Sequence, residues 1–223
     1  ALAQGAKRKI KLGVIGCGGR GSFVTDLFVA HGGFEIHAAA DYFQDRLDGF
    51  GKKFGVPAER LFATLSGYKK LLESGIEAVA IESPPFFHPE QAAAAVAAGM
   101  HVYIAKPVAV DVPGCLSIAE SGRAAGAAGK VFIVDFQTRS VKPFQDALAM
   151  VHAGALGELC FGESMYHAGN PFTGYIEGLT KNPADPEMKL RAWGLSRELS
   201  GDIITEQNIH TLDVMSWIMN AEP

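Results

Sequence analysis

The chain has 223 residues, of which 48% are hydrophobic and 20% are charged, and its formal net charge is −4 at pH 7. This is the composition of a globular protein, and the length allows one large domain or one domain and part of another. The charges form no block of one sign and no apolar run approaches the length of a membrane span, so we expect neither a nucleic-acid nor a membrane partner.

Cysteine usage and the first residues bear on metal binding and localisation. Cys17, Cys115 and Cys160 are an odd, scattered set without metal-ligand spacing, so we expect no disulfide framework and no metal site. The chain begins Ala1-Leu2-Ala3-Gln4, which has the A-x-A form of a signal-peptide cleavage site. We expect a cytoplasmic protein, or an exported or periplasmic one if this sequence is the scar of a removed leader.

A strand over 9–15 is the first predicted element, and it breaks into a glycine-rich turn before a helix over 21–31. Three glycines of the turn have the G-x-G-x-x-G spacing of dinucleotide-binding proteins. In these proteins the first glycine allows a tight turn, the second lets the backbone approach a pyrophosphate, and the third lets the helix pack closely on the strand. The predicted cofactor-binding residues here are Gly16, Cys17, Gly18, Gly19, Arg20 and Gly21. Because the chain contains 26 Gly, an ordinary glycine-rich turn is the alternative.

A second predicted strand, over 34–40, ends in Asp41. This acid lies about 20 residues after the last glycine, where a carboxylate binds the ribose 2′-hydroxyl and repels a 2′-phosphate. We therefore expect NAD in preference to NADP, with Arg46 of the following helix, over 43–54, as a further cofactor contact. A helix cap or turn residue is the alternative for Asp41.

Strands and helices continue to alternate up to about residue 155. We expect strands over 76–82, 101–105 and 130–136, and helices over 67–74, 88–99, 112–126 and 141–153. Continuously apolar strands between helices are typical of a sheet that is covered on both faces. The sequence thus predicts an α/β fold with a doubly wound parallel sheet, the Rossmann arrangement.

The alternation stops in the last third of the chain. We expect a strand over 158–167, a long loop over 170–182, an irregular stretch over 193–201 and a helix over 203–219. This predicts a dinucleotide-binding domain over 1–140. Residues 141–223 would then be the incomplete start of a second domain, for substrate binding or dimerisation.

Ligands of open parallel sheets bind at the carboxyl ends of the strands, and two polar clusters fall there. Ser83 and Pro84 follow the third long strand and would line the nicotinamide side of a cofactor. His88 opens the next helix, either as a cofactor contact or as a residue bonded to local backbone. Lys106, followed by Pro107, could hold a reacting oxygen and exchange a proton, or be an ordinary surface lysine.

The last predicted helix carries a carboxylate and an imidazole four residues apart, Glu206 and His210, with Asn208 between them. At this spacing the two side chains share one face of a helix, and a carboxylate raises the basicity of a neighbouring imidazole. The pair is suited to removing a hydroxyl proton. A solvated ion pair is the alternative, and two ligands alone are poor support for a metal.

Three segments resemble the glucose-fructose oxidoreductase/inositol dehydrogenase (Gfo/Idh/MocA) family in order and spacing. They are the glycine turn, HVYIAKPVA at 101–109 and GDIITEQNIHTLD at 201–213. The resemblance covers nearly the whole chain. It implies an NAD- or NADP-dependent oxidoreductase of sugars and polyols, with a Rossmann domain followed by an α/β domain that has a large open sheet. A homo-oligomer is expected if that second domain is complete.

The resemblance also assigns residues. Lys106 matches the catalytic lysine of the E-K-P motif, His210 matches the histidine of the D-x-x-x-H motif, and Glu206 falls on its acid. Gln137 and Arg139 match positions near the nicotinamide and the substrate. Ala105 stands beside the cofactor where the family has a glutamate, and Glu206 is one methylene longer than the usual aspartate, so we expect the chemistry but not the familiar substrates.

The predicted function is hydride transfer between a carbohydrate-like alcohol and NAD, catalysed by Lys106, His210 and Glu206. The predicted substrate contacts include Lys106, Arg139, Asn208 and His210. Aromatic residues would contact the sugar face, and the candidates are Tyr166, His167, Tyr175 and Trp193. Core packing is the alternative for each of these four. The rival functions are an NAD-retaining glycoside hydrolase that uses transient oxidation and a non-catalytic NAD-binding module.

Overall fold

The computed structural model of the protein describes residues 8–221. Contacts divide the chain into two compact units, the first ending at Val134 and the second beginning at Asp135. Within the described residues, no helix combines the length and the apolar character that crossing a membrane requires. The Ala1-Leu2-Ala3 sequence, on which the alternative of an exported protein depends, lies outside the described residues.

The first unit is built on a six-stranded sheet in the order β3-β2-β1-β4-β5-β6. Its strands are β1 (Ile10–Ile15), β2 (Phe34–Asp41), β3 (Leu61–Ala63), β4 (Ala78–Ile81), β5 (His101–Ala105) and β6 (Phe132–Asp135). The neighbouring strands from β3 to β5 all pair in parallel, which confirms the predicted sheet. Sequence analysis missed β3, because three residues are too few for a periodic pattern.

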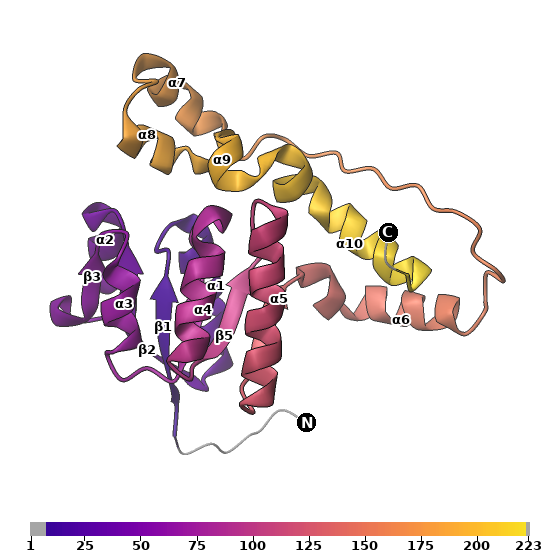
Figure 1. Ribbon diagram of the computed structural model, residues 1–223, viewed down its shortest axis with the longest axis horizontal. Coiled ribbons are helices and arrows are strands. Elements are labelled where there is room, and N and C mark those ends of the chain that lie inside the picture. The colour runs from indigo at the N-terminus through magenta and orange to yellow at the C-terminus, as the bar shows by residue number, and fades with distance from the viewer. Residues whose placement is uncertain (1–7, 222–223) are drawn as a thin grey trace. The chain divides into compact units, whose positions relative to one another are not determined.

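Helices cover both faces of this sheet, as a doubly wound fold requires. They are α1 (Gly19–His31), α2 (Gln44–Phe54), α3 (Gly67–Leu72), α4 (His88–Ala97) and α5 (Val112–Ala127). Figure 1 shows α3, α4 and α5 along one face. Successive strand residues point to opposite faces, so Ile15 packs in the core with α3, α4 and α5, whereas Leu12 and Val14 pack in the core with α2.

The strand order reverses at β1, which lies between β2 and β4. In such sheets a crevice opens at the carboxyl ends of the two strands at the reversal, here β1 and β4. The glycine turn closes tightly onto the end of β4. Gly16 has φ +92°, and a Cβ atom placed on it would be 2.5 Å from the backbone oxygen of Glu82. A Cβ on Gly21 would be 1.8 Å from the Gly16 oxygen, so α1 begins in direct contact with the turn.

Short helices make up the second unit. They are α6 (Lys142–His152), α7 (Thr173–Lys181), α8 (Pro186–Arg191), α9 (Arg197–Ser200) and α10 (Ile209–Met219), with 3-10 turns at Gln137–Ser140 and Trp193–Leu195 and a π-helical turn at Ile204–Asn208. The predicted helix over 203–219 therefore begins with a wider turn than expected. The contact boundary after Val134 falls slightly before the boundary predicted at 140.

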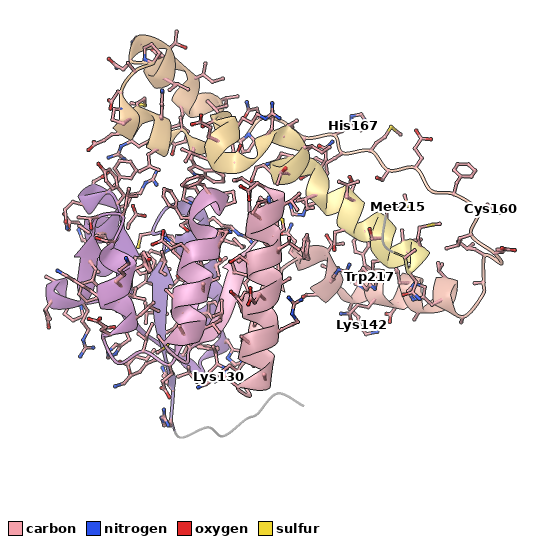
Figure 2. The ribbon with its side chains drawn as sticks, viewed as in Figure 1. Lys130, Lys142, Cys160, His167, Met215 and Trp217 are labelled. Atoms are coloured by element: carbon pink, nitrogen blue, oxygen red, sulfur yellow. The ribbon has the colours of Figure 1, made fainter. Side chains whose placement is uncertain are left out.

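Two predictions for the second unit are wrong. The described chain forms no strand over 158–167; these residues, including Cys160 and His167, run as an exposed extended segment (Figure 2). A strand needs a partner for its backbone groups, and none pairs with this segment. The loop predicted over 170–182 contains α7, in which Lys181 pairs with Glu177 at 2.6 Å. Helix α7 packs closely on α8 at Gly178, where an added Cβ would be 2.9 Å from the sulfur of Met188.

Substitution of Gly21 by alanine tests the packing of the turn. Because the new methyl group would collide with the Gly16 carbonyl, we expect the free energy of unfolding to fall by about 2 kcal/mol or more. Gly19→Ala is the matched control, since nothing lies within 4 Å of a Cβ at that position. Urea unfolding of the two variants measures the difference, and equal stabilities would contradict the close packing described here.

Candidate functional site

Gly18 differs from the other two glycines of the fingerprint. Its backbone is extended, with φ −69° and ψ −165°, a conformation open to any residue. A Cβ atom on Gly18 would meet only the Arg46 guanidinium, at 3.7 Å, which is an ordinary contact. The folded chain therefore needs glycine at 16 and 21 but not at 18. An atom that approaches from outside, such as a pyrophosphate oxygen, explains the absence of a side chain there, so the residues fit a dinucleotide.

The Asp41 carboxylate is held in one orientation by the backbone. Its Oδ2 accepts the N–H of Cys17 at 2.7 Å, and its Oδ1 accepts the N–H of Phe43 at 2.9 Å. Each oxygen has two lone pairs, so acceptor capacity remains for the ribose hydroxyls. The N–H of Cys17 is thus engaged with Asp41. Burial, followed by the Asp41 charge, raises the pKa of the Cys17 thiol well above its usual value, so the thiol stays protonated and unreactive.

Two arginines lie beside the glycine turn. The Arg46 guanidinium stands over the Phe43 ring, 4.8 Å from its centre, and next to Gly18. Arg20 lies 3.8 Å from the Glu82 carboxylate, whose side chain is fully buried at the end of β4. Both arginines are among the predicted cofactor residues, whereas Glu82 is not. A charged residue directly after a wholly apolar strand was the available signal.

Ser83, Pro84 and Lys106 lie at the carboxyl ends of β4 and β5, which pair through Ile81 and Ile104. Lys106 is half-buried, and Ala105 before it is buried in the end of β5. The Ser83 hydroxyl donates to Gln91 Oε1 of α4 at 2.6 Å. The first unit therefore gathers every cofactor residue predicted from its own sequence at one edge of the sheet.

His88 lies at this edge, but its ring contacts backbone carbonyl oxygens. This is the alternative to a cofactor contact given in the sequence analysis. It is 1% exposed, with Nδ1 2.9 Å from the Pro107 oxygen and Nε2 2.8 Å from the Ser83 oxygen. A backbone oxygen faces each ring nitrogen, so this geometry does not support the predicted direct contact between His88 and the cofactor. Burial lowers the pKa of His88 to about 4, and the Lys106 charge acts in the same direction against the backbone contacts.

A cavity of ≈ 380 Å³, lined by polar and apolar residues, lies within the second unit. Three predicted residues, Tyr166, Glu206 and Asn208, are among those that line it. Glu206 is 8% exposed and belongs to the π-helical turn, a feature that is frequent at functional sites. The His210 ring stacks on Tyr166 with centroids 5.8 Å apart and planes 26° apart. Tyr166 thus connects His210 to the cavity that Glu206 and Asn208 line.

Other predicted residues of this unit lie elsewhere. Arg139 is ion-paired with Asp213 of α10: its Nε donates to both carboxylate oxygens, at 2.9 and 3.0 Å, and its Nη2 lies 2.8 Å from Oδ1. The guanidinium also stands over the Trp217 ring. The Arg139 guanidinium therefore stabilises the second unit, and the structure does not support its predicted contact with the substrate. Gln137 is exposed on the 3-10 turn after β6. Trp193 packs edge-on against Phe172, the core-packing alternative.

The remaining aromatic candidates, His167 and Tyr175, are exposed and do not line the cavity. Gln207, from the polar stretch that includes Glu206 and Asn208, lines it as well. Asn170, Arg197 and Asp202 also line it and were not predicted. Asp202 has φ +72°, a strained value for a residue other than glycine, and it directly follows Gly201. Only the loop composition around Asn170 hinted at a site. Among residues 8–221, no three His, Cys, Asp or Glu side chains are grouped to hold a metal ion.

Comparison with known proteins identifies the first unit. A family model described as "Oxidoreductase family, NAD-binding Rossmann fold" matches residues 10–136. A solved structure of scyllo-inositol dehydrogenase from Lactobacillus casei with bound NAD(H) and scyllo-inositol is similar in fold, with a TM-score of 0.72, 24% identity, and coverage of 96% of this chain and 57% of that one. The structure of aldose-aldose oxidoreductase from Caulobacter crescentus is also similar, with a TM-score of 0.71 and 19% identity. The match covers 97% of this chain and 59% of that one.

Curated relatives give the same picture. Inositol 2-dehydrogenase 3 of Saccharopolyspora erythraea is 26% identical over 214 residues, which is 96% of this chain and 54% of that protein. A glycosyl hydrolase family 109 protein of Streptomyces filamentosus is 28% identical over 164 residues, 71% of this chain and 32% of that protein. The chain thus spans about a third to a half of the length of these two relatives.

Replacement of Gly18 by alanine separates ligand binding from folding. The methyl group has room in the folded chain, so we expect the unfolding temperature to stay at the wild-type value. The same methyl would occupy the path of the pyrophosphate and weaken NAD binding about tenfold or more. Calorimetric titration with NAD measures the dissociation constant, and an unchanged constant would remove the turn from the cofactor site.

The buried imidazole predicts a pH dependence of stability. An unfolded histidine titrates near 6.5, above the folded value of about 4 for His88. Between these values the unfolded chain binds a proton that the folded chain does not, so the free energy of unfolding falls as the pH drops. We expect His88 to account for a loss of about 2 kcal/mol between pH 7 and pH 5.

Urea unfolding at the two pH values measures this loss, and His88→Gln should lack it because glutamine does not titrate. Equal losses in the wild type and the variant would contradict the assignment.

Proposed function

The chain belongs to the Gfo/Idh/MocA family of oxidoreductases with an NAD-binding Rossmann fold, and on that premise we propose that it transfers hydride between an alcohol carbon of a sugar or polyol and NAD. The observation that carries this proposal is Gly18, where a glycine is present without any need of the folded chain for one. Inositol dehydrogenases among the relatives support the class of substrate.

The preference for NAD over NADP rests on Asp41. Its carboxylate is 9% exposed and is oriented by two backbone N–H groups, so it can accept both ribose hydroxyls without reorganising. A 2′-phosphate would bring a second anion against this carboxylate. Arg46, beside Gly18, offers its positive charge to the pyrophosphate from the other side.

Three residues would carry the chemistry. When bound, NAD supplies the hydride acceptor or donor at its nicotinamide ring. His210 takes the hydroxyl proton of the substrate, or returns it in the reverse direction. Lys106 holds the same oxygen and stabilises the alkoxide charge that develops on it. Glu206 orients His210 or a hydroxyl of the substrate.

The cavity of the second unit supports a polyhydroxylated substrate. It combines carboxylates, amides and a guanidinium with the Tyr166 ring, which suits a ligand that has hydroxyl groups and C–H faces. Tyr166 and Asn208 are the proposed substrate contacts among the residues that line it. The long side chain of Glu206, in place of the aspartate typical of the family, favours a substrate that differs from those of the inositol dehydrogenases.

A second candidate is a glycoside hydrolase that retains NAD and oxidises its substrate transiently. Relatives named glycosyl hydrolase family 109 proteins favour it, and they cover about 71% of this chain. It would use the same cofactor site and the same Lys106. Release of a sugar from a glycoside without net accumulation of reduced cofactor would identify it, whereas net reduction of NAD by free polyols identifies the dehydrogenase.

Substitution of the proposed catalytic residues tests the main proposal. Lys106→Ala and His210→Ala remove a charge-stabilising group and a proton acceptor, so each should lower the rate of NAD reduction about 10²- to 10⁴-fold. The NAD dissociation constant should change less than about threefold, since these losses concern the transition state. A panel of sugars and polyols, followed by the absorbance of reduced nicotinamide, measures the rate.

Lys69→Ala, on the exposed face of α3, is the control and should behave as wild type. Wild-type rates in both Lys106→Ala and His210→Ala would contradict the assignment of the catalytic residues. Absence of NAD reduction by every compound tested with the wild type would contradict the oxidoreductase itself.

A further inference from the structure

One buried imidazole joins the two loops at which the nicotinamide side of the site is expected. His88 Nε2 lies 2.8 Å from the Ser83 oxygen in the loop after β4. Its Nδ1 lies 2.9 Å from the Pro107 oxygen in the loop after β5. These strands are paired neighbours in the sheet, so the imidazole spans from one carboxyl end to the next.

The same helix holds the first loop by a second contact. Gln91, three residues after His88 on α4 and 6% exposed, accepts the Ser83 hydroxyl at 2.6 Å. The loop after β4 therefore has two attachments to α4, one through its carbonyl and one through its hydroxyl. The loop after β5 is attached to α4 through His88, which contacts the backbone of Pro107 and of Val108.

Lys106 directly precedes Pro107, and its charge is close enough to act on the His88 ring. A lysine side chain has four rotatable bonds, so the position of its ammonium depends on how firmly its backbone is held. A shift of about 1 Å at a catalytic group can cost a factor of about 10² in rate. The contact that holds the backbone next to Lys106 is therefore in a position to control hydride transfer.

We propose that His88 is a positioning residue, which acts through the Pro107 carbonyl to hold Lys106 in its catalytic place. This inference rests on the proposed role of Lys106. The lowered pKa leaves the His88 ring neutral with one N–H, which in the Nδ1–H form donates to the Pro107 oxygen while Gln91 holds Ser83. His88 exchanges no proton in the reaction, because it is buried away from solvent. It acts on the substrate only by way of the lysine.

Two substitutions test the contacts of Nδ1 and Nε2 separately. The amide nitrogen of asparagine is as many bonds from Cβ as Nδ1, and that of glutamine as many as Nε2. His88→Asn thus retains a donor for Pro107 and loses the contact with Ser83, which Gln91 still holds. His88→Gln retains the contact with Ser83 and loses the one with Pro107.

We expect His88→Gln to slow hydride transfer in a single turnover about 10- to 100-fold, with NAD affinity near the wild-type value. His88→Asn should recover most of that rate, although both variants lose stability. In the Lys106→Ala background, His88→Gln should have no further effect on the rate. A merely structural histidine predicts equal rate losses in the two variants, and that result would overturn the proposal.

His37 offers a matched control elsewhere in the unit. It is 4% exposed, and its ring contacts Glu35, Arg60 and Ser74, none of which is a predicted site residue. His37→Gln should lower stability as other buried substitutions do, with hydride transfer at the wild-type rate. A rate loss equal to that of His88→Gln would also overturn the proposal, since it would make the effect a general one.

A readout without turnover keeps this inference separate from the proposed function. The lysines are labelled by reductive methylation with a ¹³C source, and the Lys106 resonance is assigned with Lys106→Arg. We expect His88→Gln to shift or broaden this resonance, and His88→Asn and His37→Gln to leave it in place. An unchanged resonance in His88→Gln would overturn the proposal, whereas a wild type that reduces no NAD would overturn the proposed function alone.

Discussion

The absence of space between the glycine turn and the end of β4 is the constraint on which the cofactor site depends. Side chains at Gly16 and Gly21 would collide with the backbone oxygens of Glu82 and Gly16. The turn therefore lies directly on the point where the strand order reverses, and α1 starts there with the positive end of its helix dipole. The proposed site for a pyrophosphate rests on this packing and on the room beside Gly18, where only Arg46 lies near.

The same turn orients Asp41, the proposed ribose-binding residue. Because Cys17 donates its N–H to Asp41, the carboxylate at the end of β2 is attached to the loop after β1. The elements that bind the two halves of the proposed cofactor are in this way parts of one hydrogen-bonded structure. On the other side of β1, His88 joins the loops after β4 and β5. Preorganised contacts of this kind reduce the reorganisation that binding and catalysis require.

Sequence patterns predicted the first unit well because its helices and all of its strands except the three-residue β3 have a local signature. Apolar strands such as Ala78–Ile81 alternate with helices that start or stop at glycine and proline, and the fingerprint residues are close together in sequence. The second unit was predicted less well. The exposed segment over 158–167 has an apolar pattern but no partner strand, and α7 forms from residues that are typical of loops.

Side-chain roles that depend on long-range contacts also escaped prediction. The family resemblance predicts a substrate contact for Arg139, but Asp213, far away in sequence, holds its guanidinium. Both readings of His88 were open until the structure put one backbone oxygen at each ring nitrogen. No local pattern encodes such pairings, because they arise when the chain brings distant segments together.

The transfer of an isotope tests the central claim most directly. A polyol carrying deuterium on its alcohol carbon is incubated with the protein and NAD, and the cofactor is recovered and examined by mass spectrometry and NMR. Hydride transfer predicts one deuterium on the nicotinamide ring of net-reduced cofactor. Recovery of unlabelled, oxidised NAD from every polyol tested would contradict the account.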